Sequence, residues 1–108
     1  MQFYAHHGWY EAERKIGQLF TVDLCCKIDS MAGSKDDIQR TIDYQQLYDF
    51  IRIKMQQRHQ LLESLLDEIG DALISEFPML LEVSLTIHKQ PQLGGRFINV
   101  QVSKSFFP

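Results

Sequence analysis

Apolar and polar residues alternate along three stretches of the chain, which is the pattern of β-strands with one buried face. In the stretch 18–29 every second side chain is apolar, and the shared face carries Phe20, Val22, Leu24, Cys26 and Ile28. The alternation recurs at 81–89 and from 98 to 102, where the apolar positions are Leu81, Val83, Leu85 and Ile87, then Ile98, Val100 and Val102. With a short strand at 2–5, the pattern predicts four strands, and a turn at Gly94-Gly95 separates the last two.

Between the second and third strands, apolar residues recur at three- and four-residue spacing, which is typical of amphipathic helices. The first helix begins at Asp43, with Gln46 three positions later as in a capping box, and its apolar stripe is Leu47, Phe50, Ile51 and Met55. Pro78 ends the second helix, whose stripe is Leu62, Leu65, Leu66, Ile69, Leu73 and Phe77. Tyr44 therefore lies at the start of the first helix, and Glu63 lies in the first turn of the second.

The order strand, strand, helix, helix, strand, strand predicts an α+β fold, with a four-stranded antiparallel sheet and both helices on one face. A chain of 108 residues has the length of one domain, so we take 1–108 as a single unit. Such a sheet leaves two edge strands with unpaired backbone groups. We therefore expect the chain to associate with further copies of itself.

Composition and charge narrow the class of protein. Apolar residues make up 44% and charged residues 23%, as in globular proteins, and 11 Lys and Arg against 14 Asp and Glu give a net charge of -3. This balance argues against a nucleic-acid partner, which would require a basic surface. No apolar run approaches the roughly 20 residues that span a membrane, and residues 1–5 lack the features of a signal peptide, so we expect a cytosolic protein. Cys25 and Cys26 are adjacent and predict no disulfide framework.

Four ionisable residues lie at predicted element ends and loops, where functional residues concentrate: Glu13, Tyr44, Glu63 and Lys89. Lys89, at the end of an apolar strand face, either extends its ammonium to water or serves as a desolvated base with a lowered pKa. Glu63 is either a carboxylate favoured by the helix dipole or an acceptor for a pair of N–H groups on a ligand ring. Tyr44 and Glu13 are by default a core aromatic and a loop charge.

The four histidines give no metal-binding spacing, so no metal is expected. His6 and His7 are adjacent and diverge if the strand continues, while His59 and His88 stand alone. We expect all four to be ordinary polar histidines. The sequence also lacks a glycine-rich phosphate loop and a Gly-x-Ser-x-Gly elbow, so nothing points to a nucleotide cofactor or a serine hydrolase.

Five segments in register, covering nearly the whole chain, make the sequence resemble the dihydroneopterin aldolases. They are Phe3-Tyr4-Ala5-His6-His7-Gly8, Glu13 followed by Ile16-Gly17-Gln18-Leu19-Phe20-Thr21-Val22-Asp23, Thr41-Ile42-Asp43-Tyr44, Leu61-Leu62-Glu63 and Ile87-His88-Lys89. The resemblance implies the tunnelling fold, in which subunits assemble around a barrel as tetramers or octamers, with active sites between neighbours. Relatives usually carry several residues before the segment that matches Met1-Gln2-Phe3, so we expect a weakened first strand.

The resemblance also implies a role for each candidate residue. Lys89 matches the lysine that acts as general base, and Tyr44 matches the tyrosine that assists proton transfer from the neighbouring subunit and contacts the substrate. Glu63, with Leu62 beside it, matches the glutamate that holds the pterin 2-amino group and ring N–H. Glu13 matches the loop glutamate that completes the catalytic set.

The implied reaction cleaves 7,8-dihydroneopterin into 6-hydroxymethyl-7,8-dihydropterin and glycolaldehyde in folate biosynthesis, with epimerisation at C2' sharing its intermediate. Breaking the C1'–C2' bond requires a base at the 2'-hydroxyl and an electron sink, and the ring imine of the substrate, protonated at N5, is that sink. The expected reaction therefore uses no metal or organic cofactor, and Lys89 forms no Schiff base.

Two alternatives remain at this point. A dihydroneopterin triphosphate epimerase of the same superfamily would require a cationic patch, to which Arg14, Lys15 and Arg96 could contribute, although the net charge of -3 offers little support. A non-catalytic pterin-binding or assembly module could share the same fold, because a fold alone does not determine function. The presence of Lys89, Tyr44 and Glu63 together favours the enzyme.

Overall fold

The computed structural model of the protein describes residues 1–7, 10–11, 17–28, 43–57, 59, 61–89, 92–93, 96–97 and 99–108. Its main sheet has four antiparallel strands in the order β1-β2-β3-β6, namely β1 (Gln2–Ala5), β2 (Gln18–Ile28), β3 (Leu80–Lys89) and β6 (Val100–Phe106). Two helices connect β2 to β3, α2 (Tyr44–Met55) and α3 (Leu62–Glu76). Between β3 and β6 two short strands pair with each other, β4 (Gln92–Leu93) and β5 (Arg96–Phe97). The predicted order of four main strands and two helices is confirmed.

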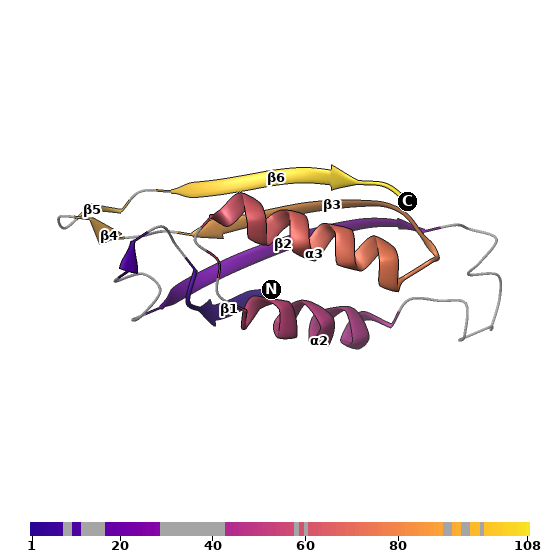
Figure 1. Cartoon of the computed structure of the whole chain (residues 1–108), viewed down its shortest axis with the longest axis horizontal. Helices are drawn as coiled ribbons and strands as arrows, with labels where there is room; N and C mark the ends of the chain where they lie inside the picture. The colour runs from indigo at the N-terminus through magenta and orange to yellow at the C-terminus, as the bar shows by residue number, and fades with distance from the viewer. Residues whose placement is uncertain are drawn as a thin grey trace.

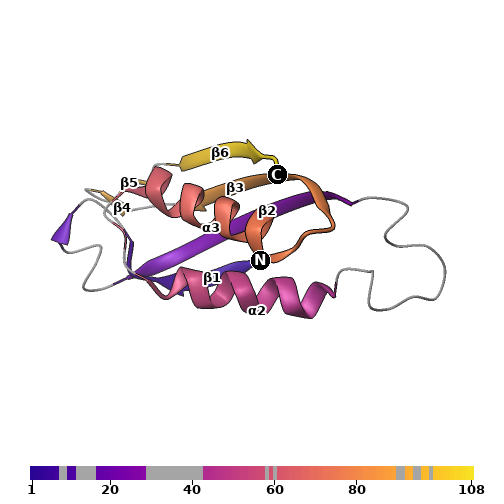
Figure 2. The same ribbon diagram turned by 45° about the vertical axis from the view of Figure 1, so that its right-hand side comes forward.

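Both helices cover the same face of the main sheet (Figures 1 and 2). α3 packs on β3 and β6, and α2 packs on β1. Phe20, Val22 and Ile87 point from the sheet into this layer and are fully buried. Burial of each such side chain contributes roughly 1.5–3 kcal/mol, so the core between sheet and helices holds the fold together. Of the helices in the described ranges, none is long and apolar enough to cross a membrane.

The two helices begin in different ways. Asp43 caps α2, because its side chain accepts a hydrogen bond of 2.9 Å from the backbone N–H of Gln45. This confirms the helix start that the sequence predicts and makes Tyr44 the first helical residue. α3 follows Leu61, whose side chain offers no such hydrogen bond. Leu61 therefore leaves the backbone N–H groups of the first turn without a cap from its own side chain.

Leu81 is an expected core residue that the structure places on the surface. The alternation puts Leu81 on the buried face, but it is 51% exposed while Leu80 is 1% exposed. The pairing of β2 with β3 gives the reason, because Lys27 pairs with Glu82 whereas the next residue, Ile28, pairs with Leu80. A β-bulge at Leu81 adds one residue to β3, and one extra residue exchanges the two faces of a strand.

Gly70 allows α3 to lie directly against the end of β6. A Cβ atom at this position would overlap the ring of Phe106, which is 4% exposed and packed in the hydrophobic core. We expect Gly70→Ala to lower the free energy of unfolding by about 1–2 kcal/mol, because overpacking outweighs the better helix propensity of alanine. Urea denaturation at fixed protein concentration measures this change. Ser75→Ala, at an exposed position of the same helix, is the control, and an unchanged stability of Gly70→Ala would contradict the prediction.

Candidate active site

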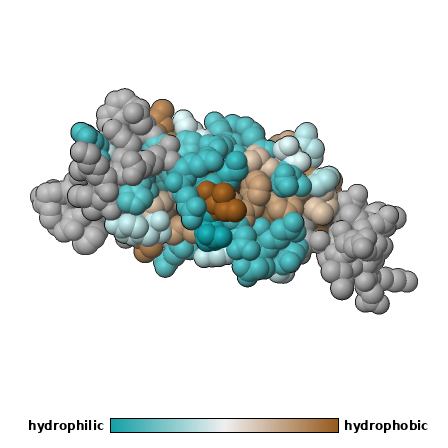
Figure 3. Space-filling model, turned by 60° about the horizontal axis from the view of Figure 1, so that its bottom comes forward, coloured by the Kyte–Doolittle hydropathy of each residue, from teal (hydrophilic) through white to brown (hydrophobic). Residues whose placement is uncertain are grey.

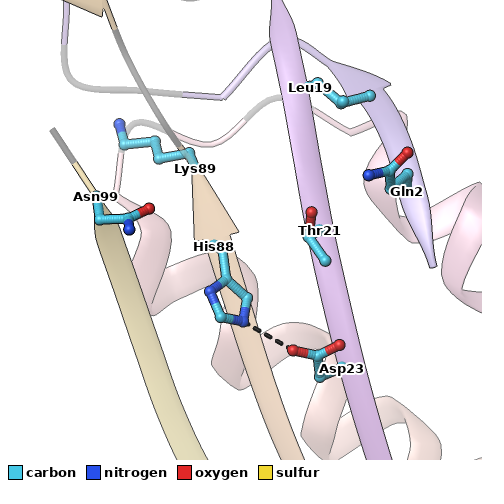
Figure 4. A pocket seen from close by; sticks show the side chains of 7 residues that line it. All are labelled: Gln2, Leu19, Thr21, Asp23, His88, Lys89 and Asn99. Atoms are coloured by element: carbon cyan, nitrogen blue, oxygen red, sulfur yellow. Dashed lines mark hydrogen bonds and ion pairs between the residues drawn. The ribbon is translucent and has the colours of Figure 1, made fainter. Parts of the chain in front are cut away.

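Lys89 is the last residue of β3 and is half-buried. It pairs across the sheet with Phe20, whose side chain is buried beneath the helices. Directly paired residues of antiparallel strands point to the same face, so Lys89 continues the apolar face as the alternation predicts. Figure 4 shows its side chain leaving the end of β3 in a direction away from Asp23. The ammonium group is therefore carried at the end of the sheet.

A polar cavity of about 540 Å³ borders Lys89 on the face of the sheet that no described helix covers. Its lining consists of Gln2, Leu19, Thr21, Asp23, His88, Lys89 and Asn99 (Figure 4). Within it, Nε2 of His88 lies 2.8 Å from Oδ2 of Asp23. The polar positions of the two alternating strands place both residues on one face, but the alternation alone does not predict that they pair. A small molecule in this cavity would lie next to Lys89, the last residue of β3.

Glu63 lies at the same end of the molecule as Lys89, because α3 begins beside the end of β3 (Figure 1). Leu62 is buried in the core with 8% of its surface exposed, whereas Glu63 is exposed. The buried leucine thus anchors the first turn while the carboxylate of Glu63 points outward. Together with the uncapped N–H groups of this turn, Glu63 can offer a ligand both hydrogen-bond acceptors and donors.

Tyr44 lies at the opposite end of the molecule. It is 85% exposed at the start of α2, whereas Met55, at the end of this helix, contacts His7 near Lys89 and Glu63. The helix rises about 1.5 Å per residue, so roughly 16 Å separate Tyr44 from Met55. Within one chain Lys89 and Glu63 lie at the same end of the molecule, whereas Tyr44 lies at the other end. Glu13 lies outside the described residues.

A second cavity, of about 660 Å³, borders Tyr44 between β2 and α2. Its lining is mostly apolar and consists of Met1, Leu24, Cys26, Ile28, Tyr44, Leu47 and Tyr48. Burial raises the pKa of the Cys26 thiol, with a smaller contribution from Cys25, so Cys26 acts here as a neutral, apolar wall. Seen from the side of α2, apolar side chains interrupt an otherwise largely hydrophilic surface (Figure 3). Tyr44 thus carries its hydroxyl at the border of an apolar pocket.

His7 is buried, which its polar residue type does not predict. Only 1% of its surface is exposed, and its ring contacts that of Phe20 edge-on at a centroid distance of 5.2 Å. Burial lowers the pKa of His7 from 6.5 to about 4, although the hydrogen bond to the Met55 carbonyl acts in the opposite direction. Phe3, Ala5 and His7 occupy every second position, so the period of a strand was the signal for this burial.

Acid is expected to destabilise the fold through His7. The unfolded chain binds a proton near pH 6.5 and the folded protein only near pH 4, so the unfolded state binds more protons between these values. Above pH 6.5 His7 is neutral in both states and does not lower the free energy of unfolding. As the pH drops to 4, protonation of His7 in the unfolded state lowers the free energy of unfolding by about 3 kcal/mol. Urea denaturation of the wild type and of His7→Asn between pH 7 and 4 isolates this contribution from the carboxylates. The unfolding free energy of the variant should fall less steeply, and parallel pH profiles would contradict the assignment.

Comparisons with known proteins agree with this arrangement. A sequence model of the dihydroneopterin aldolase family matches residues 1–104. The dihydroneopterin aldolase of Staphylococcus epidermidis is 33% identical over 105 residues, which cover 94% of this chain and 87% of the relative. That of Bacillus subtilis (strain 168) is 32% identical over 105 residues, with 94% of this chain and 88% of the relative covered. The Escherichia coli dihydroneopterin aldolase in complex with neopterin matches in structure with a TM-score of 0.80 at 21% identity, covering 98% of this chain and 96% of that one.

The two kinds of comparison support different statements. The structural match confirms the tunnelling fold that the sequence resemblance implies. The sequence matches extend over nearly the whole chain and include the segments that carry Tyr44, Glu63 and Lys89. The chain therefore belongs to the dihydroneopterin aldolase family.

Proposed function

We propose that the protein cleaves the C1'–C2' bond of 7,8-dihydroneopterin, releasing glycolaldehyde and 6-hydroxymethyl-7,8-dihydropterin, as a step of folate biosynthesis. The observation that carries this proposal is the placement of Glu63 and Lys89 at one end of the molecule, at the start of α3 and the end of β3. A ring held at Glu63 would direct its side chain toward Lys89. That is the geometry a base-catalysed cleavage of the side chain requires.

Glu63 and the first turn of α3 bind the pterin ring in this proposal. The carboxylate accepts hydrogen bonds from the 2-amino group and the neighbouring ring N–H, which are both donors. The uncapped backbone N–H groups of the turn, those of Leu62 and Glu63 among them, are available to the ring carbonyl. Because the Leu62 side chain is in the core, its part in binding is limited to the backbone.

Lys89 supplies the base. It removes the proton of the 2'-hydroxyl, directly or through a water molecule, and the C1'–C2' bond breaks as the C2' carbonyl of glycolaldehyde forms. The bonding electrons pass to C6 and the protonated N5 of the ring, and a proton delivered to C1' then completes the hydroxymethyl product. The substrate is its own electron sink, so the scheme calls for no metal or organic cofactor. Re-addition of glycolaldehyde to the other face before release would give the C2' epimer.

Tyr44 reaches this site from a neighbouring subunit in our proposal, with Glu13 completing the catalytic set. The separation of Tyr44 from Lys89 within one chain supports a site shared between copies, and a ring of four or two such rings would close the sheet edges. The apolar cavity beside Tyr44 offers the neighbour a surface for the flat pterin ring.

Mixed assemblies test the shared site. Co-expressed Lys89→Ala and Tyr44→Phe chains with different tags are purified as hybrids by two affinity steps. Each variant alone should be impaired, whereas about a quarter of the sites in a random equal mixture combine an intact Lys89 with an intact Tyr44. We therefore expect glycolaldehyde formation well above that of either parent. Hybrids no more active than their parents would place Tyr44 and Lys89 in one chain or outside the mechanism.

The activity itself is tested by incubating the protein with 7,8-dihydroneopterin and quantifying both products. The triphosphate is assayed in parallel. The carboxylate of Asp23 borders the cavity next to Lys89, and an anion as highly charged as a triphosphate would be repelled there. Preferential turnover of the triphosphate would favour the epimerase, and binding of pterin with no turnover would favour a non-catalytic module.

A further inference from the structure

The imidazole of His7 joins two backbone segments that are far away in sequence. Its Nε2 atom lies 2.8 Å from the carbonyl oxygen of Met55, and its Nδ1 atom lies 3.2 Å from the backbone nitrogen of His59. The N–H of His59 must donate, so Nδ1 accepts and Nε2 carries the proton that is donated to Met55. The ring is therefore a neutral, fully used connector, which we term the His7 clamp: His7, the Met55 carbonyl and the His59 N–H.

The His7 clamp holds the connection between α2 and α3. Met55 is the last residue of α2, and His59 lies four residues before Glu63. The His59 ring is fixed as well, because its Nε2 lies 2.7 Å from Oε2 of Glu68 on α3, in ion-pair range rather than in a well-directed hydrogen bond. His59, in the segment that leads into α3, is thus attached to His7 through its backbone N–H and to Glu68 of α3 through its side chain.

The clamp also reaches β2, the strand that pairs with the strand carrying Lys89. The His7 ring packs edge-on against Phe20, and Phe20 is the cross-strand partner of Lys89. One buried ring therefore contacts both the residue opposite Lys89 and the segment that leads to Glu63. A displacement of this ring would change the distance between the end of β3 and the start of α3. Among the described residues, His7 is the one polar side chain that is fully buried.

We propose that His7 is a positioning residue for the pterin site, which sets the first turn of α3, and with it Glu63, relative to Lys89. This inference rests on the function proposed above for Glu63 and Lys89. The bond that matters is the one from the His59 N–H to Nδ1, because it fixes the segment immediately before α3. The bond to Met55 secures the end of α2 and bears on stability more than on binding.

Two substitutions separate the two bonds of the ring. In His7→Asn the side-chain oxygen takes a place close to that of Nδ1 and can accept from His59, while the bond to Met55 is lost. In His7→Gln the amide nitrogen reaches the place of Nε2 and can donate to Met55, while the bond to His59 is lost. Both variants lose one hydrogen bond and ring packing, so we expect similar losses of stability.

The expected result is a difference in binding without a matching difference in stability. By calorimetry, His7→Gln should bind neopterin at least tenfold more weakly than the wild type, whereas His7→Asn should retain most of the wild-type affinity. In turnover assays, His7→Gln should show a raised KM. Gly70→Ala is the control for stability loss away from the clamp and should retain the wild-type Kd. Equal affinities of His7→Asn and His7→Gln, or a Kd that follows stability in all three variants, would overturn the proposal.

A second pair of variants decides the matter if His7→Gln fails to fold or assemble. His59→Pro removes the backbone N–H, and His59→Ala keeps it while removing the ring. The proposal expects weaker neopterin binding in His59→Pro than in His59→Ala, and equal binding would overturn it. Wild-type protein and Glu63→Gln are measured alongside. If the wild type neither binds neopterin nor cleaves the substrate, the proposed function fails. If the wild type is active but the two His7 variants have equal affinity for neopterin, and the two His59 variants likewise, only the positioning role is refuted.

Discussion

Replacing Lys89 by alanine is expected to lower kcat for dihydroneopterin cleavage by roughly 10²–10⁴-fold, the usual contribution of a positioned base. The Kd for neopterin should change little, because in the proposed mechanism Lys89 acts at the side chain of the substrate and Glu63 holds the ring. A loss confined to kcat is the signature of an interaction made in the transition state. Release of glycolaldehyde at saturating substrate measures kcat, and calorimetry measures the Kd.

Lys104→Ala is the matched control for the loss of a lysine. Lys104 lies on β6, the strand next to β3, and its Nζ forms an ion pair of 2.8 Å with Asp67. The control removes the same charge from the same sheet and should leave turnover intact. Borohydride added during turnover should trap no adduct on Lys89, since the imine belongs to the pterin. Normal turnover of Lys89→Ala would remove the lysine from the mechanism, and a trapped adduct would refute the scheme without a Schiff base.

Glu63→Gln is expected to weaken neopterin binding by tenfold or more with a smaller effect on kcat. The amide removes the charge and presents an N–H₂ donor to the donors of the pterin ring. Charge-assisted hydrogen bonds contribute roughly 1.5–3 kcal/mol each, and the loss of one of them already corresponds to about tenfold or more in Kd. Calorimetry with neopterin on the folded, assembled variant measures the effect.

Glu76→Gln makes the same substitution at the other end of α3, where Glu76 is the exposed last residue of the helix. It controls for the general loss of a carboxylate from this helix. Because Glu63 also lies in the first turn, its replacement should cost about 0.3–1 kcal/mol through the helix dipole, which denaturation will register separately. Wild-type affinity in Glu63→Gln would show that this carboxylate serves the helix start only and that the pterin binds elsewhere.

The element order and most of the core could be predicted because they depend on local periodicity. Alternation at 18–28 identified the face of β2 that is buried at Phe20 and Val22, although Ile28 at its end is 41% exposed. The helical stripes identified the residues of α2 and α3 that face the sheet. The start of α2 at Asp43 could be predicted because a capping side chain bonds to a backbone N–H within two residues of its own position. Lys89 kept the parity of its strand to the last residue, so its face was predictable as well.

The departures arise where a pairing or a burial depends on a distant segment. Leu81 is exposed because β2 and β3 shift their pairing at Lys27 and Ile28, and a bulge leaves no mark in the alternation of one strand. His7 is buried because Met55 and His59 satisfy both of its ring nitrogens, and these partners are 48 and 52 residues away. A polar residue type therefore hid a core position. The proximity of Glu63 and Lys89, too, follows from how α3 lies on β3 and not from the spacing of the two residues in the sequence.

The length of α2 has a consequence for how the protein behaves on dilution. If Tyr44 at one end of this helix serves a site at the far end of a neighbouring chain, an isolated subunit holds no complete set of catalytic groups. Specific activity per subunit would then depend on protein concentration. It would fall steeply where the assembly of subunits dissociates and recover when the solution is concentrated again. Subunit association would act as an obligatory switch, and a cell would obtain activity only above the concentration at which the assembly forms.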